Sequence, residues 1–372
     1  AAVLIAGLLL AGCSSLNPFS SSGPKVAPLK QITESVRARE DWRVRVGSAG
    51  SFVLQPVVLG GVVYAAASDG SVVRIEGGKL IWKTALKATL SGGVGGNADL
   101  LLVATAKGDV YGLDPASGQT RWKVNVNAEV LAPPALGEGV VVVRSADSRL
   151  FGLDPVDGRR RWVYQRVTPT LALRNSAGVV IDSKAIFAGF PGGKLAAVNA
   201  SNGALMWEGT VAVPRGATEL ERVADISSLP ALGSRAACAV AYQGRVACFD
   251  LANGSTLWTR DISSARGLDM DDRNVYVTDD KGAVHALDLA SGASAWKQDQ
   301  LVTRAPGRPL SFRDYVVVGD LEGYVHFLSK DDGSIVGRQR TDSSPVIADL
   351  QRAGGEIVVQ TRDGSVFALG VQ

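Results

Sequence analysis

The stretch Gly108-Asp-Val-Tyr-Gly-Leu-Asp114-Pro-Ala-Ser-Gly118-Gln-Thr-Arg-Trp122 is the clearest copy of a motif that recurs along the whole chain. The motif reads Gly-x-Val-x-x-Leu-Asp-x-x-x-Gly-x-x-x-Trp, and it has eight starts: Gly70, Gly108, Ser148, Gly193, Gly244, Gly282, Gly323 and Gly364. All seven tryptophans of the chain occupy its last position: Trp42, Trp82, Trp122, Trp162, Trp207, Trp258 and Trp296. The eighth such position holds Gly337. A period of about 40 residues is typical of stacked supersecondary units.

Each part of the motif has a physical role in a tight antiparallel pair of strands. The β-branched and aromatic residues of Val-x-x-Leu favour a strand. The Asp can accept a hydrogen bond from the backbone two residues further on, which favours a turn. The Gly four residues after it supplies a positive φ without a steric penalty. The Trp then lies on the return strand, where its large ring can fill the gap between neighbouring sheets.

The repeat predicts an all-β fold, an eight-bladed β-propeller of four-stranded antiparallel blades over residues 38–372. A second hairpin precedes each start, so every unit holds four short strands. The last start, at Gly364, has no Trp strand after it, whereas the strand around Trp42 has no start before it. We therefore expect the N- and C-terminal strands to share one blade, which closes the ring and removes its exposed edges.

The head of the chain has the character of an export signal. Residues 1–12 are small and apolar, too few to span a bilayer, and are expected to be part of a signal peptide. The segment Leu10-Ala-Gly-Cys13 resembles the lipobox of bacterial lipoproteins, which implies lipidation of Cys13. Ser14 after the cysteine implies, by the same resemblance, export to the outer membrane. Residues 13–37 are expected to form the lipidated N-terminus and a flexible tether rich in Ser, Pro and Gly.

Composition and cysteine usage limit the possible functions. The 39 basic and 36 acidic residues nearly balance, so there is no electrostatic case for binding nucleic acid. Cys238 and Cys248 flank a hairpin, and an oxidising compartment would permit a disulfide between them. A three-residue loop would set them opposite each other and a two-residue loop would offset them. The sequence leaves this register open.

Few residues are candidates for catalysis or metal binding. The two histidines, His285 and His326, fill the position that holds Tyr or Phe in other repeats, and we interpret them as packing residues. The polar stretch 269–274 has no Gly at the sixth position of a calcium loop. No Ser/His/Asp set or metal-ligand spacing is present. The sequence therefore predicts a protein that is not an enzyme and has no metal or cofactor.

Two neighbouring repeats depart from the others. The connections from Trp162 to Gly193 and from Trp207 to Gly244 are longer than the equivalent ones elsewhere, so both should emerge on the same rim of the ring. They combine apolar residues with single charges, as partner-binding patches do. The candidate partner-binding residues are Leu171, Leu173, Arg174, Glu219, Arg222 and Asp225. Alternatively, the two loops pack on each other, with Arg174 paired to an acid of the second loop.

The chain resembles the BamB family, the propeller lipoproteins of the outer-membrane β-barrel assembly (BAM) machinery. The resemblance covers nearly the whole chain, and its most specific segments are 171–174, 217–225 and 318–325. It implies a non-enzymatic scaffold on the periplasmic side of the outer membrane that binds the POTRA domains of BamA and aids insertion of nascent β-barrel proteins. The contacts that it implies are Leu171, Leu173, Arg174 and Asp225. A second acid of the family pattern is replaced here by Ser227.

Two other classes of propeller protein are alternatives. Quinoprotein dehydrogenases share the eight-bladed architecture, but their adjacent cysteines and long inserts with calcium-binding acids are missing here, and a shared fold does not transfer an activity. A glycan-binding propeller would need exposed aromatic residues on one rim. All seven tryptophans are instead assigned to the repeat.

Overall fold

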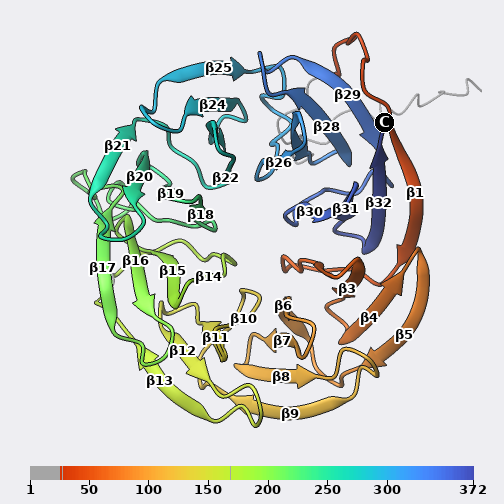
Figure 1. Cartoon of the computed structure of the whole chain (residues 1–372), viewed down its shortest axis with the longest axis vertical. Helices are drawn as coiled ribbons and strands as arrows, with labels where there is room; N and C mark the ends of the chain where they lie inside the picture. The colour runs from red at the N-terminus through yellow and green to blue at the C-terminus, as the bar shows by residue number, and fades with distance from the viewer. Residues whose placement is uncertain (1–25, 27, 168) are drawn as a thin grey trace, which may run out of the picture.

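The computed structural model describes residues 26, 28–167 and 169–372, which form a closed ring of eight antiparallel sheets (Figure 1). Every sheet has four strands. The described residues contain no helix, and so none that could cross a membrane. The eight-bladed propeller expected from the repeat is confirmed.

The strands occupy four positions from the axis to the rim. The innermost strands are β2 (Val57–Leu59), β6 (Leu90–Gly96), β10 (Ala135–Gly137), β14 (Val180–Asp182), β18 (Ala231–Leu232), β22 (Gly267–Met270), β26 (Leu310–Phe312) and β30 (Gln351–Ala353). The second strands are β3 (Val62–Ala66), β7 (Leu101–Thr105), β11 (Val140–Arg144), β15 (Ala185–Phe190), β19 (Ala236–Val240), β23 (Asn274–Thr278), β27 (Tyr315–Gly319) and β31 (Glu356–Gln360).

The third and fourth strands carry the repeated motif. The third strands are β4 (Ser71–Glu76), β8 (Asp109–Leu113), β12 (Leu150–Leu153), β16 (Lys194–Asn199), β20 (Val246–Asp250), β24 (Val284–Asp288), β28 (Tyr324–Ser329) and β32 (Ser365–Val371). The outermost strands, which carry the tryptophan position, are β5 (Lys79–Ala85), β9 (Thr120–Asn125), β13 (Arg160–Tyr164), β17 (Leu205–Thr210), β21 (Thr256–Arg260), β25 (Ser294–Gln298), β29 (Ile335–Arg340) and β1 (Ala38–Arg45).

The tryptophans join each blade to the next one. Six of them donate the indole N–H to a backbone carbonyl of the following blade, at distances of 2.7 to 3.2 Å. Trp122, for example, bonds the carbonyl of Pro155, directly after the motif's Asp154. The turn glycine of the same blade, Gly158, lies against the Trp122 ring, and a Cβ there would come within 2.8 Å of it. The repeat therefore encodes the contact between blades as well as the hairpin.

The ring closes through the blade that β1 shares with β30, β31 and β32. β1 pairs with β32, with Trp42 opposite Ala368, which confirms the expected sharing of one blade by the two ends of the chain. The lead-in to β1 lies on the blade of β26–β29, where the backbone N–H groups of Ser35 and Val36 contact the carbonyl of Val336. The last residues of the expected tether thus pack on the ring.

The missing tryptophan at Gly337 is explained by this lead-in. A Cβ at position 337 would lie 2.8 Å from the Val36 carbonyl oxygen, so a side chain cannot occupy the position that tryptophan fills elsewhere. Val36 is 3% exposed and packs with Phe327 and Leu369 in the apolar cluster of the closing blades. The N-terminal segment therefore takes the place of the eighth tryptophan.

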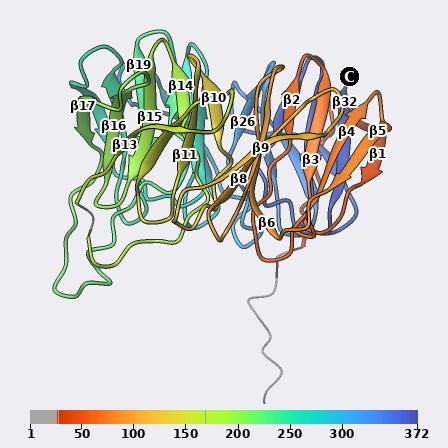
Figure 2. The ribbon, with the colours of Figure 1, turned by 90° about the horizontal axis from the view of Figure 1, so that it is seen from below.

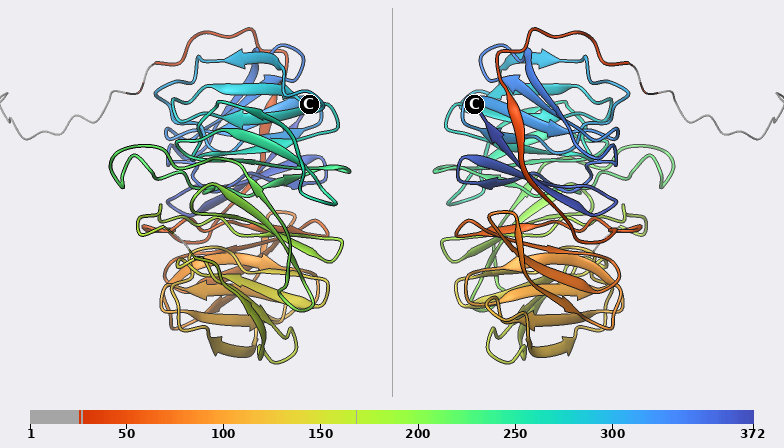
Figure 3. Two further views of the ribbon diagram at one scale, coloured as in Figure 1. Left: turned by 90° about the vertical axis from the view of Figure 1, so that its left-hand side faces the viewer. Right: turned by 90° about the vertical axis from the view of Figure 1, so that its right-hand side faces the viewer.

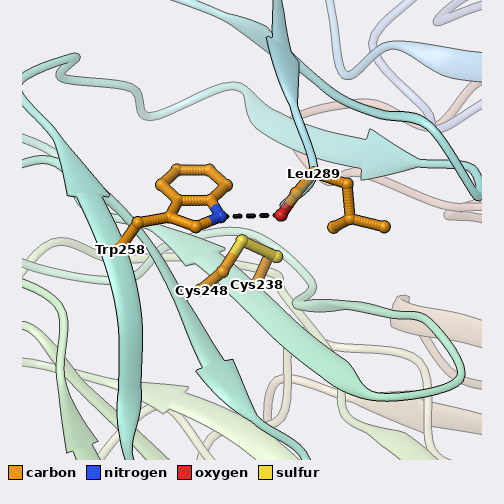
Figure 4. The surroundings of a disulfide bond; sticks show 4 residues. All are labelled: Cys238, Cys248, Trp258 and Leu289. Atoms are coloured by element: carbon orange, nitrogen blue, oxygen red, sulfur yellow. Dashed lines mark hydrogen bonds between the residues drawn. A yellow bond between two sulfur atoms is a disulfide. The ribbon is translucent and has the colours of Figure 1, made fainter. Parts of the chain in front are cut away.

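Cys238 and Cys248 form a disulfide between β19 and β20 (Figure 4). The two residues are paired directly across the hairpin, because the Ala241 N–H bonds the Arg245 carbonyl and leaves a three-residue loop. Both cysteines are fully buried, and they pack with Trp258 in the cluster between two blades. This is the first of the two registers that the sequence left open.

Candidate partner-binding surface

Two connections between an outermost strand and the next innermost strand are longer than the others. The first long loop runs over residues 165–179, between β13 and β14, and the second long loop over residues 211–230, between β17 and β18. Both emerge on one face of the ring, and the second projects furthest from it (Figures 2 and 3). The expectation that they share a rim is therefore confirmed.

Asp225 holds the two long loops together. Its carboxylate accepts hydrogen bonds from the backbone N–H of Leu173, at 2.6 Å, and of Gly192, at 3.0 Å. The side chain is only 1% exposed, so Asp225 lies beneath the surface that was expected to include it. In this arrangement it positions the first long loop and has almost no area to offer a partner.

A buried arginine, which sequence reasoning did not single out, supports the same region. Arg144 ends β11 and donates a hydrogen bond to the carbonyl of Ala177 at 3.1 Å, with its guanidinium over the Phe190 ring. Burial lowers the pKa of Arg144 to about 10, and the charge of Asp225 opposes this shift. The sequence feature that could have indicated Arg144 is its place directly after four valines, Val140–Val143. A charge at the end of a buried strand needs polar partners.

The first long loop presents Leu171 and Arg174 to solvent. Leu171 is 42% exposed, whereas Leu173 is half-buried. The Arg174 guanidinium pairs with Glu129, at 2.8 Å, and this hydrogen bond raises the pKa of Arg174. Glu129 belongs to the connection between β9 and β10. In the alternative of two loops that pack on each other, the pairing of Arg174 with an acid of the second long loop is therefore wrong. The two loops do contact each other, through Leu173 and Asp225.

The second long loop is a compact, internally bonded projection. Arg222 pairs with Glu219 at 3.1 Å and donates to the carbonyls of Gly216 and Ala217. Two backbone N–H groups bond the Glu221 carboxylate and lower its pKa. Leu220 is 69% exposed. Arg222 is thus held at the surface by contacts within its own loop, and Leu220 lies near it in the sequence.

The remaining residues that the sequence analysis considered are the lipidation candidate Cys13 and the two histidines. Cys13 lies outside the described residues. His285 and His326 are not merely packing residues, because each ring bonds an aspartate six positions earlier, Asp279 at 2.9 Å and Asp320 at 2.8 Å. Within the described residues, no three His, Cys, Asp or Glu side chains converge as metal ligands would.

Comparison with known proteins gives one consistent result. The family model described as outer membrane protein assembly factor BamB matches residues 75–298 and 300–372. A relative of that name from Bordetella pertussis is 42% identical over 371 residues, covering 98% of this chain and 95% of its own. The relative from Escherichia coli K12 is 34% identical over 381 residues, covering 98% and 97%.

Solved structures agree with this result. The crystal structure of BamB from Moraxella catarrhalis has a TM-score of 0.84 and 25% identity, covering 90% of this chain and 100% of its own. Quinohemoprotein alcohol dehydrogenase from Comamonas testosteroni has a TM-score of 0.72 at 12% identity, covering 89% and 76%, and this likeness concerns the fold alone. The relatives from Bordetella pertussis and Escherichia coli are both named as assembly factors. The protein belongs to the family of the outer membrane protein assembly factor BamB.

Proposed function

We propose that this chain is a lipid-anchored scaffold of the outer-membrane β-barrel assembly complex, which docks on the POTRA domains of BamA and aids insertion of β-barrel proteins. Its family membership supports the role in assembly. The lipobox-like segment ending at Cys13 supports an anchor at the outer membrane, with the ring in the periplasm.

The observation that carries the docking proposal is the surface of mixed apolar and charged residues built by the two long loops. Leu171 and Leu220 supply exposed apolar area, and Arg174 and Arg222 supply charge beside it. The carboxylate of Asp225 ties the loops to each other. Apolar anchors next to arginine, held in place before binding, are typical of protein interfaces. The role of Asp225 in docking is then to position Leu173 and its neighbours.

Capture of BamA POTRA domains by the full chain tests this proposal. Leu171→Ala and Arg174→Ala are each expected to weaken capture by about 1–4 kcal/mol, because they truncate anchor residues. The melting temperature should be nearly unchanged, because both side chains are exposed. Leu257→Ala is the matched control, because Leu257 is 49% exposed on the outermost strand β21.

A second control concerns the ion pair inside the surface. Glu129→Ala removes the internal partner of Arg174 and leaves the cation in place. Capture should then be retained, unless the pair itself is what the partner recognises. If Leu171→Ala and Arg174→Ala bind POTRA domains as well as the parent chain, the two long loops are not the docking surface.

A further inference from the structure

A polar cavity of about 290 Å³ lies at the ring axis. Its wall is built by the connections that enter six of the innermost strands, β2, β14, β18, β22, β26 and β30. The hairpins between β27 and β28 and between β31 and β32 complete it. The two long loops contribute their last residues, so the cavity opens on the face from which these loops project.

The charges that line the cavity are predominantly positive. Three arginines, Arg266, Arg308 and Arg362, line it together with one carboxyl group, that of Asp349. Arg308 is partly neutralised, since it lies 3.6 Å from Asp349 and 3.9 Å from Asp269. Burial raises the pKa of Asp349, and the charge of Arg308 opposes this shift.

Arg266 and Arg362 are the available cations. Each comes from a separate connection, before β22 and between β31 and β32. Among the described residues, neither guanidinium has a hydrogen-bond or ion-pair partner, whereas Arg308 donates to the Leu268 carbonyl at 2.8 Å. Both residues are exposed, so their guanidinium groups are open to solvent and accessible to an anion at the cavity.

Two hydroxyl groups at the cavity wall are also without partners. The Oγ atoms of Ser227 and Ser228 are buried and make no hydrogen bond within the described residues. Ser228 is 6% exposed, so bulk water does not compensate it. A buried hydroxyl without a partner costs free energy, so a ligand that forms a hydrogen bond with it gains affinity.

We propose that this cavity binds carboxylate-bearing ligands, with Arg266 and Arg362 holding the carboxylates and the Ser228 hydroxyl donating a further hydrogen bond. The planar guanidinium fork matches a carboxylate in two parallel hydrogen bonds. Guanidinium groups also bind phosphate in this way, so inorganic phosphate is the competing anion in the test. The carboxylates can belong to a free small molecule or to an acidic stretch of polypeptide.

Calorimetric titration of the full chain in detergent, at low salt and pH 7, tests the proposal with citrate as the probe. Citrate is expected to bind one site, and R266Q/R362Q is expected to raise its Kd at least about tenfold. S228A should raise it severalfold. R160Q/R235Q is the matched control, because it removes two arginines that are exposed and line no part of the cavity, and its Kd should be unchanged.

A second probe, hexaglutamate, separates the two sources of carboxylate. Competition between hexaglutamate and citrate indicates a polypeptide-borne group, and binding of citrate alone indicates a free small molecule. The proposal is overturned if citrate does not bind, if it binds R266Q/R362Q as well as the parent chain, or if inorganic phosphate binds as tightly. The result is read apart from docking, because Arg266 and Arg362 lie outside the two long loops. Ser228 lies in the second long loop, but it is 6% exposed and is not one of the candidate partner-binding residues.

Discussion

At the scale of single residues, the repeat joins a glycine of one blade to the tryptophan of the blade before it. Gly158 adopts a φ of +75° in the turn after Asp154, and the Trp122 ring lies where a Cβ would project. Two separate requirements therefore select glycine there: a left-handed backbone and the close approach of a ring. The tryptophan N–H completes the contact through a backbone carbonyl, so it does not depend on side chains in the next blade.

Gly158→Ala should therefore lower the free energy of unfolding by more than an ordinary glycine substitution does. Gly354→Ala is the control, because Gly354 has a φ of +61° with no atom within 4 Å of the added Cβ. We expect the control to lose about 1–2 kcal/mol of unfolding free energy, because of its left-handed backbone alone. Gly158→Ala should lose about 2–5 kcal/mol, because overpacking against Trp122 is added. Urea unfolding measures both losses. Equal losses would show that the contact with the Trp122 ring adds no destabilisation.

At the scale of elements, the β19–β20 hairpin is covalently closed. The disulfide joins residues ten positions apart, both buried next to Trp258. Closing a loop of this length is expected to stabilise the fold by about 2–3 kcal/mol, mainly by restricting the unfolded chain. C238A/C248A should lose that amount in urea unfolding. Adding reductant should destabilise the parent chain and leave the double variant unaffected. An equal effect on both would show that the reductant does not act through this disulfide.

The blade of β26–β29 contains a buried polar network around His326. The ring nitrogen Nε2 bonds the Asp320 carboxylate, to which Arg304 also donates at 2.6 Å. Arg338 donates to Nδ1 at 3.3 Å, which makes Nδ1 the acceptor and Nε2 the proton carrier of a neutral ring. Burial lowers the pKa of His326, against the effect of Asp320. Burial alone would raise the pKa of Asp320, but the hydrogen bond and charge of His326 lower it.

The fold should consequently lose stability in mild acid. His326 is held neutral in the folded chain, so the unfolded chain binds more protons once the pH falls below about 6.5, the ordinary histidine value. The stabilisation is present above that pH and is lost below it, by up to about 1.4 kcal/mol per pH unit for one group. Urea unfolding between pH 7.5 and 5 measures the slope. His326→Gln should flatten it, and an unchanged slope would assign the dependence to other groups.

At the scale of the whole molecule, the ring is closed by β1 and by the segment just before it. Residues 35–37 bond both the outermost strand β29 and the last residue of the chain, Gln372. Val36 fills the space that Gly337 leaves open. The closing blade therefore depends on a segment that precedes the first strand, and the ring is joined there by packing as well as by strand pairing.

Val36→Asp should open this closure. A carboxylate at a position that is 3% exposed has no partner, so we expect a loss of about 2–4 kcal/mol. Limited proteolysis should then cut within residues 28–45 before the rest of the ring. Val156→Asp is the control, since Val156 is 83% exposed in a turn and its substitution should change stability by less than about 0.5 kcal/mol. Equal protease resistance of the two variants would contradict the closing role of Val36.

The candidate site was predictable in outline and not in detail. The lengths of two connections located the surface, because equivalent connections of neighbouring blades share a face of the ring. Sequence could not separate Leu171 and Arg174, which are exposed, from Asp225, which is buried under them. Likewise, Arg174 and Glu129 belong to connections of different blades, and the spacing of the repeat does not predict that they pair.

The sequence by itself determined the number of blades, their strand order and the sharing of one blade by the chain ends, because these follow from hairpins that pair within about 40 residues. Only the tertiary structure decided why Gly337 replaces a tryptophan, which register joins Cys238 to Cys248, and that three arginines meet at the axis. The physical reason is the sequence separation of the contacts. Pairing within a blade joins residues close in the sequence, so the period of the repeat predicts it. Contacts between blades, and above all those at the axis, join residues far apart in the chain that only the closed ring brings together.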